Sequence, residues 1–211
     1  MEASTVKRVS VTNEESQRAF QRMTRDLLVH NPEEGTNHWG GASVPGMLLG
    51  ADRVVEFLRV LEDVMGFLPA RRQSYLVGYK SGRRGAELLA QFFHDTPPEQ
   101  LPWRVLSAAP ATLAGIGWGR CAIEYDEKSR EVRWEFPRGT ALALGSRLEG
   151  VRKDPSCAFI AGFAAGCTNH VLHTELEFEE VECVGRGEAR CLFESGEFLR
   201  FRKGETRAGP H

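Results

Sequence analysis

Hydrophobic residues recur at helical spacing in two segments of the first third of the chain. An amphipathic helix is predicted over residues 12–29, opened by a capping box of Thr12 and Glu15. A second helix is predicted over residues 51–66. Its expected apolar stripe consists of Val54, Phe57, Leu58, Leu61, Val64 and Met65.

Two further helices are expected to carry glycines where another element approaches closely. One runs from about residue 70 to residue 94, and the other covers residues 157–173. Small residues on a helix face allow a neighbouring backbone to pack against it. The glycines in question are Gly78, Gly82 and Gly85 in the first of these helices, and Gly162 and Gly166 in the second.

Between and after these helices the period changes to the alternation of half-buried strands. Residues 117–136 predict a hairpin with a polar turn at 126–130, and in it Val132, Trp134 and Phe136 alternate with charged residues. Residues 174–198 predict a second hairpin, with a tight turn at 185–189. The fold class we expect is α/β (α+β), an antiparallel sheet with helices packed on one side.

The pattern divides the chain into three parts. Residues 1–40 are expected to form an N-terminal helix and a flexible arm rich in Gly, Pro and Asn. Residues 41–200 form the main domain, and residues 201–211 form a polar tail. A helix with an apolar stripe on a flexible arm is suited to packing on a second copy, so we expect a homodimer; packing on its own domain is the alternative.

Composition narrows the class of protein. The chain has 211 residues, of which 41% are hydrophobic and 27% charged, with a net charge of -2. A near-neutral charge argues against direct nucleic-acid binding, which usually needs a concentrated positive field. No apolar run approaches the roughly 20 residues that span a bilayer, and the first residues lack the apolar core of a signal peptide. We therefore expect a cytoplasmic protein.

Five cysteines give the first chemical clue. An odd count without an export signal argues against a disulfide framework and favours metal binding or burial. Four of the five fall in the last third of the chain, and the full set is Cys121, Cys157, Cys167, Cys183 and Cys191.

Three of these cysteines are expected to converge. Cys183 and Cys191 lie on either side of the second hairpin's turn, so the turn brings them together, and Cys157 lies where a helix begins. Zinc prefers four tetrahedral ligands drawn from thiolate, imidazole and carboxylate. A fourth ligand must be local, and Glu180 is the best candidate, since a β-bulge between it and Cys183 brings both to one side.

Other interpretations of these residues remain open at this point. Glu182 competes as the carboxylate, and His170 or His173 as an imidazole. Three buried cysteines without a metal fit the spacing about equally well. Cys167 and His170 lie one helical turn apart, but no third group orients them, so core packing is favoured over catalysis. No acid–base pair or phosphate-binding glycine loop stands out, so we expect a binding domain rather than an enzyme.

Residues 157–196 closely resemble the 4-vinyl-reductase-type domain family, and the segment 76–89 resembles that family's glycine-containing helix. The family includes the sensory modules of bacterial activators that respond to phenols and other aromatics, stand-alone proteins, and proteins of bacteriochlorophyll biosynthesis. The resemblance implies a fold related to subunits of the vesicle-tethering transport particle. It also implies a zinc site at Cys157, Glu180, Cys183 and Cys191, which favours Glu180 over Glu182.

The resemblance further implies a ligand pocket between the helices and the sheet, where a His and a Trp anchor a phenolic hydroxyl. Those two positions fall at Ala111 and near Phe136, and other lining positions fall at Phe163, Cys167 and Phe178. Because Ala111 offers no hydrogen bond, we expect an apolar or aromatic ligand other than simple phenol. A protein-interaction module with a filled cavity is the alternative function, followed by an accessory factor of tetrapyrrole metabolism.

Overall fold

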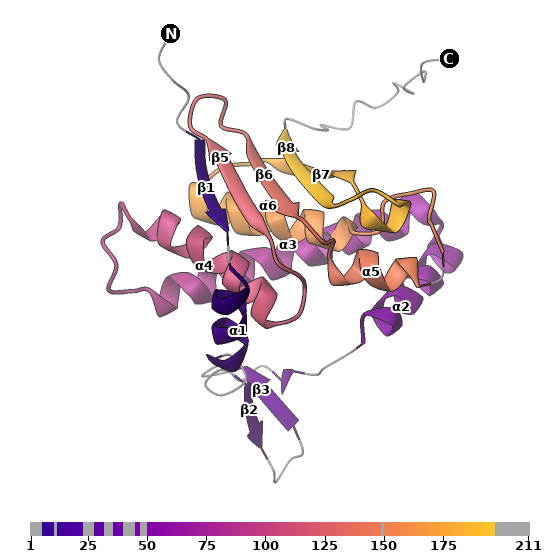
Figure 1. Ribbon diagram of the computed structural model, residues 1–211, viewed down its shortest axis with the longest axis horizontal. Helices are drawn as coiled ribbons and strands as arrows, with labels where there is room; N and C mark the ends of the chain where they lie inside the picture. Colours follow the sequence, from indigo (N-terminus) through magenta and orange to yellow (C-terminus); the bar gives the residue numbers. More distant parts are fainter. Residues whose placement is uncertain are drawn as a thin grey trace.

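An antiparallel sheet of five strands forms one layer of the molecule (Figure 1). The computed structural model describes residues 6–10, 12–22, 28–31, 36–39, 45–46, 50–148 and 150–196. Every neighbouring pair of strands in the sheet is antiparallel. In spatial order the strands are β1 (Val6–Ser10), β5 (Ala122–Asp126), β6 (Val132–Phe136), β8 (Cys191–Gly196) and β7 (Glu177–Glu182).

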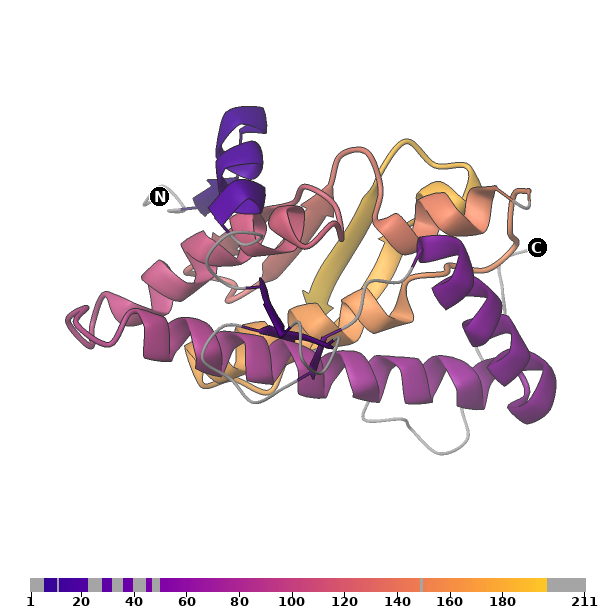
Figure 2. The ribbon, with the colours of Figure 1, turned by 90° about the horizontal axis from the view of Figure 1, so that it is seen from below.

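Helices cover one face of this sheet, as Figure 2 shows. α6 lies against β7 and β8, α4 lies against β1 and β5, and α3 packs along α6. The predicted fold class, α+β with an antiparallel sheet and helices on one side, is therefore confirmed. Among the described residues, no helix is both long and apolar enough to cross a membrane. The helices are α1 (Asn13–Arg22), α2 (Ala51–Met65), α3 (Phe67–Phe92), α4 (Leu101–Gly115), α5 (Ala141–Arg147) and α6 (Ala158–Leu172).

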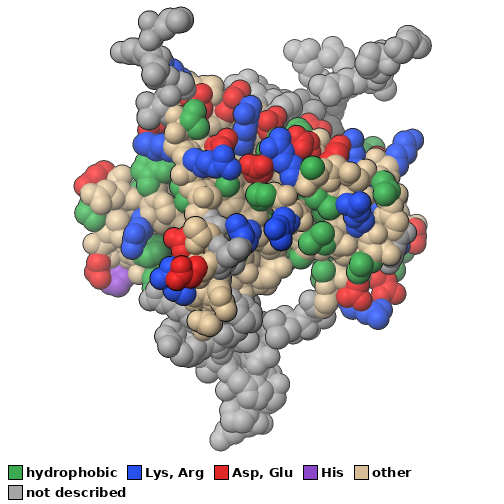
Figure 3. All heavy atoms as spheres, viewed as in Figure 1, with side chains coloured by type: hydrophobic (Ala, Val, Ile, Leu, Met, Phe, Trp, Pro, Cys, Tyr) green, Lys and Arg blue, Asp and Glu red, His purple; other side chains and the backbone are tan. Residues whose placement is uncertain are grey.

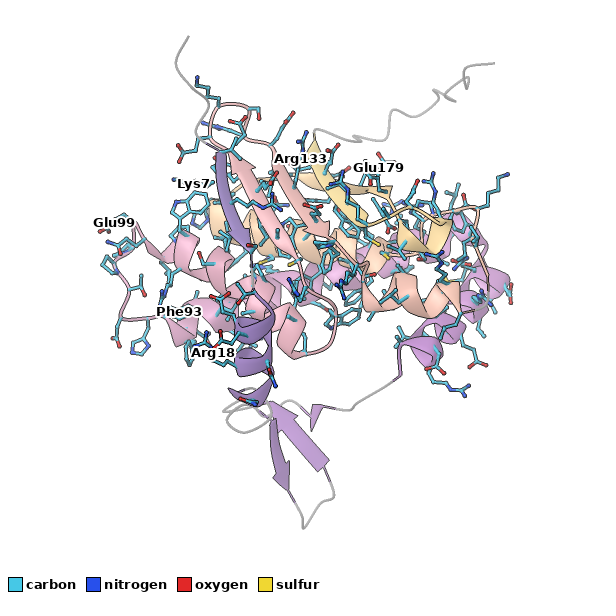
Figure 4. The ribbon with its side chains drawn as sticks, viewed as in Figure 1. Lys7, Arg18, Phe93, Glu99, Arg133 and Glu179 are labelled. Atoms are coloured by element: carbon cyan, nitrogen blue, oxygen red, sulfur yellow. The ribbon has the colours of Figure 1, made fainter. Side chains whose placement is uncertain are left out.

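Strand β6 has the predicted alternation between a buried and a solvent-facing side. Its Val132, Trp134 and Phe136 are fully buried, whereas Arg133 is exposed. Acidic and basic side chains are interspersed over the outer face of the sheet (Figure 3). Arg133 on β6, labelled in Figure 4, pairs there with Glu194 of β8 at 3.0 Å. The outer face is thus solvated, and the core lies between the sheet and the helices.

Four glycines bring α3 and α6 into backbone contact, as the sequence predicted. A Cβ added to Gly78 or Gly82 would collide with the carbonyl group of Phe159 or Phe163. The contact is reciprocal, because Gly162 and Gly166 of α6 face the carbonyls of Tyr75 and Tyr79 in α3 in the same way. Gly85 differs, since its added Cβ would meet only the ring of Phe163 at an ordinary 3.7 Å.

Helix α2 matches its predicted bounds, but its apolar stripe is only partly buried. Val54 and Leu58 pack against the core, whereas Phe57 is 61% exposed and Val64 is 78% exposed. The predicted burial of the whole stripe is therefore wrong. α2 lies at one end of the molecule and contacts α3 and α5, and these two neighbours cover only part of its circumference.

The N-terminal segment differs most from its prediction. Thr12 and Glu15 do form the expected capping box: the Thr12 N–H donates to Glu15 at 2.8 Å, and the Glu15 N–H donates to Thr12 at 3.2 Å. The helix ends earlier than predicted, because residues 28–31 are already a strand. In place of a loop, a three-stranded antiparallel sheet forms from β2 (Leu28–Asn31), β3 (Thr36–Trp39) and β4 (Pro45–Gly46).

Helix α1 lies beside α4 of the same chain. The homodimer and the division at residue 40 stay predictions. The polar tail at 201–211 lies outside the described residues, as do residues 23–27 of the predicted first helix.

Candidate metal centre

Four side chains from separate elements converge beside the end of the sheet where β8 begins. Their ligand atoms all lie within 4.8 Å of one another, and all four residues are buried. One is the N-cap of α6, one lies on β7, one directly follows β7, and one is the first residue of β8. In that order they are Cys157, Glu180, Cys183 and Cys191.

A break in strand pairing sets the geometry of the second hairpin. The register between β7 and β8 shifts between Glu180 and Glu182, which is the bulge that the sequence predicted. Cys183 follows β7 rather than lying on it, a correction to its predicted place. A 3₁₀ turn at Val184–Arg186 comes next, and Gly187 then adopts a positive φ of 94°. The bulge and the turn together direct Glu180 and Cys183 to the same side.

The Glu180 carboxylate is only half satisfied by hydrogen bonds. Its Oε2 accepts the backbone N–H of Cys157 at 2.8 Å. Its Oε1 is buried and has no hydrogen-bond donor among the described residues. Leaving a buried carboxylate oxygen unpaired is costly, and a cation placed among the thiols removes that cost.

The four acidic groups also perturb one another's pKa values. Burial raises the pKa of the Cys157 thiol well above its ordinary value. Burial, reinforced by the neighbouring Cys183, raises the pKa of Glu180 to about 8. Hydrogen bonds from Cys157 and Cys191 lower the pKa of Cys183. Such a cluster resists ionising as a whole by itself, whereas a divalent cation favours the charged form of every member.

These donors fit zinc in number, type and spacing. Structural zinc takes four ligands, with Zn–S near 2.3 Å and Zn–O near 2.0–2.2 Å, which places tetrahedral sulfur ligands about 3.8 Å apart. A cluster within 4.8 Å matches that arrangement. Thiolates disfavour magnesium and calcium, which take oxygen ligands.

The competing candidates lie apart from the cluster. Glu182 instead forms ion pairs with Arg190, with contacts of 2.8 and 2.9 Å, and these hydrogen bonds lower its pKa. His170 lies in the last turn of α6, and His173 is the exposed C-cap of that helix. The groups of three or more potential metal ligands found in the described part of the chain include none of the three.

Sequence reasoning missed the polar groups that surround the thiols. The Thr140 hydroxyl lies 3.0 Å from Cys157 Sγ, and the Ser156 hydroxyl lies 3.5 Å from Cys183 Sγ. The Val184 backbone N–H donates to Cys191 Sγ at 3.4 Å. One signal was present in the sequence, because Thr140 precedes the short apolar helix α5 and occupies its N-cap position.

The predicted pocket residues occupy the core rather than lining an identified cavity. Phe136, Cys167 and Phe178 are buried, and Phe163 packs against them. Phe136 makes an edge-on contact with Phe193, and burial raises the pKa of Cys167 to about 12, so Cys167 is a poor nucleophile. Ala111 is half-buried on α4, outside that cluster.

A buried donor–acceptor pair within this core also escaped sequence reasoning. The Trp134 indole N–H donates to the Thr168 hydroxyl at 3.3 Å, and both residues are fully buried. The Phe163 ring packs edge-on against Trp134, with centroids 6.3 Å apart. One of the hollows in the described structure, of about 320 Å³, lies elsewhere at the start of α4, lined by Thr96, Glu99, Gln100, Trp103, Arg104 and Ser107.

The fold and the buried cluster define an α+β domain with a candidate thiolate–carboxylate metal centre. Residues 148–197 match the family model of the vinyl-4-reductase domain, which confirms the predicted resemblance. A segment of 43 residues is 40% identical to an uncharacterized protein of Methanocaldococcus jannaschii. That segment is 20% of this chain and 26% of that protein, so the match spans about a quarter of the curated relative.

Solved structures share the fold over more of the chain. The phenol-responsive sensory domain of the transcription activator PoxR, solved with phenol, matches with a TM-score of 0.69. The match is 22% identical and covers 87% of this chain and 92% of that one. A trafficking protein particle complex subunit 3 from Naegleria fowleri matches with a TM-score of 0.47 at 16% identity, covering 71% and 97% of the two chains.

Proposed function

We propose that this chain is a regulatory sensor domain stabilised by one zinc ion that Cys157, Glu180, Cys183 and Cys191 hold. The observation that carries the metal is the unpaired Glu180 Oε1, buried among three thiols. The ion supplies a positive charge that keeps the thiols ionised and the three segments joined. The fold that the chain shares with a phenol-responsive sensory domain supports the regulatory function.

The choice of carboxylate leads to a specific prediction. Glu180→Gln removes the ligand charge without changing the side chain's shape, so zinc affinity should fall at least about tenfold. Glu182→Gln is the matched control, because it breaks only the partly exposed ion pair with Arg190 and should leave zinc affinity unchanged. Competition with a chromophoric chelator measures both affinities, and elemental analysis should give one zinc per wild-type chain. The reverse order of affinities would mean that Glu182 is the ligand.

The ligand we propose is apolar or aromatic and is not simple phenol. The core beside α6 contains Phe163, Phe136, Cys167 and Phe178, which offer apolar surface and one weak thiol. The polar groups identified there, Trp134 and Thr168, already satisfy each other. A phenol hydroxyl must therefore break that hydrogen bond or remain unpaired, at a cost of about 1–3 kcal/mol. An apolar ligand avoids this cost.

Calorimetric titration of the purified, zinc-loaded chain tests this specificity. Phenol should bind at least about tenfold more weakly than naphthalene or toluene of comparable solubility, because burying an unpaired hydroxyl opposes binding. Thr168→Val is the matched variant, since it leaves the Trp134 N–H free to meet a phenolic oxygen and should narrow the difference. Micromolar phenol binding by the wild type would overturn the proposed specificity.

A protein-interaction module is the second candidate, and exposed apolar side chains on α2 and the start of α3 favour it. Phe57, Val64 and Leu68 all point to solvent, the last being 74% exposed. Large apolar side chains gathered on a surface often mark an interaction site. Failure of every apolar and aromatic compound to bind in the same titration would favour this candidate over the sensor.

A further inference from the structure

The Thr140 hydroxyl links a proposed zinc ligand to helix α5. Thr140 lies between β6 and α5 and is fully buried. Its oxygen accepts the Ala143 backbone N–H at 3.1 Å, as the N-cap of α5. The same oxygen lies 3.0 Å from Cys157 Sγ. This is the shortest polar contact described between a side-chain hydroxyl and a cluster sulfur.

The direction of the contact follows from counting protons. A hydroxyl has one proton, and the Thr140 oxygen already accepts a hydrogen bond from Ala143, so this proton is free to point toward the sulfur. A metal-bound Cys157 is a thiolate and has no proton to give. With a metal present, Thr140 therefore donates and the Cys157 sulfur accepts.

We propose that Thr140 is a positioning residue of the metal centre, which holds the Cys157 thiolate in place by donating a hydrogen bond to its sulfur. This inference rests on the proposed zinc site. The Cys157 backbone N–H is already held by Glu180 Oε2, so Thr140 fixes the other end of the same residue. Ser156 cannot substitute for it, because its hydroxyl lies farther from Cys157 Sγ, at 3.7 Å.

Cobalt(II) substitution tests the hydrogen bond directly, because the sulfur-to-cobalt charge-transfer band reports the electron density on the thiolates. Thr140→Val keeps the side chain's shape and removes the donor. The band should move to longer wavelength, and metal binding should weaken by roughly 10–100-fold in a chelator competition. Thr140→Ser keeps the donor and should restore both. Thr168→Val, another buried threonine that lies on α6, should move neither.

A merely structural threonine gives a different result. Loss of the α5 cap alone lowers the melting temperature of Thr140→Val while the charge-transfer band stays where it is in the wild type, and that outcome overturns the inference. A wild-type chain that binds neither zinc nor cobalt rejects the metal centre itself. Binding by the wild type with an unshifted variant rejects only the role of Thr140.

A measurement on the unmodified sequence covers the case in which Thr140→Val does not fold. In protein loaded with ¹¹³Cd, a slowly exchanging threonine hydroxyl proton should correlate with cadmium through Cys157 Sγ. The Val184 backbone N–H, which donates to Cys191 Sγ, is the internal reference for such coupling. A spectrum with the Val184 correlation and no hydroxyl correlation overturns the inference.

Discussion

Cys183→Ser is expected to abolish zinc binding and to unfold most of the chain at 37 °C. The substitution removes a central member of the cluster and leaves Glu180 buried with its Oε1 unpaired. Structural zinc contributes several kcal/mol or more to folding. A loss of about 5 kcal/mol lowers the melting temperature by roughly 10–20 °C in a domain of this size. Calorimetry and elemental analysis of any soluble fraction measure the two effects.

Cys121→Ser is the matched control, because Cys121 is buried in the core but lies outside the cluster. It should keep one zinc per chain and lose at most about 2 kcal/mol of stability. A strong chelator should then destabilise the wild type and Cys121→Ser alike, while having no further effect on Cys183→Ser. A Cys183→Ser variant that melts with the wild type contradicts a structural metal.

The candidate centre could be predicted because its chemistry is concentrated in a few residue types close together in the sequence. The hairpin turn places Cys183 near Cys191, and a helix start places Cys157. The carboxylate was harder, since Glu180 and Glu182 are separated by a bulge whose position no periodicity fixes. The resemblance to a known family favoured Glu180, and the observed geometry groups that residue with the cysteines.

The elements that escaped prediction lack a clear period. Helix α4 contains Pro102 and Pro110 and has few polar residues, so no amphipathic pattern marks it. Helix α5 has only seven residues, which is too short for a pattern. Strand β1 is recognisable only through its pairing with β5, more than a hundred residues away.

The interior pairing of the core is equally invisible in the sequence. Trp134 and Thr168 are 34 positions apart, and their hydrogen bond depends on how α6 packs on the sheet. Thr140 and Cys157 meet for a similar reason, because α5 and α6 begin side by side at the metal centre. Local patterns predict which residues are buried, whereas the packing of whole elements decides which of them touch.

The packing of α3 on α6 leads to the second large effect, a severe loss of stability in Gly82→Ala. The added Cβ would lie 2.8 Å from the carbonyl carbon of Phe163, and rigid helical backbone on both sides prevents a local adjustment. The helices must separate, which also breaks the reciprocal contact of Gly166 with Tyr79. We expect a loss of about 3 kcal/mol or more, a fall in melting temperature of roughly 6–12 °C by calorimetry. Gly85→Ala, one turn along, has ordinary space and gains helix propensity, so it should be neutral or slightly stabilising. Equal stability of the two variants would show that the helices do not pack this closely.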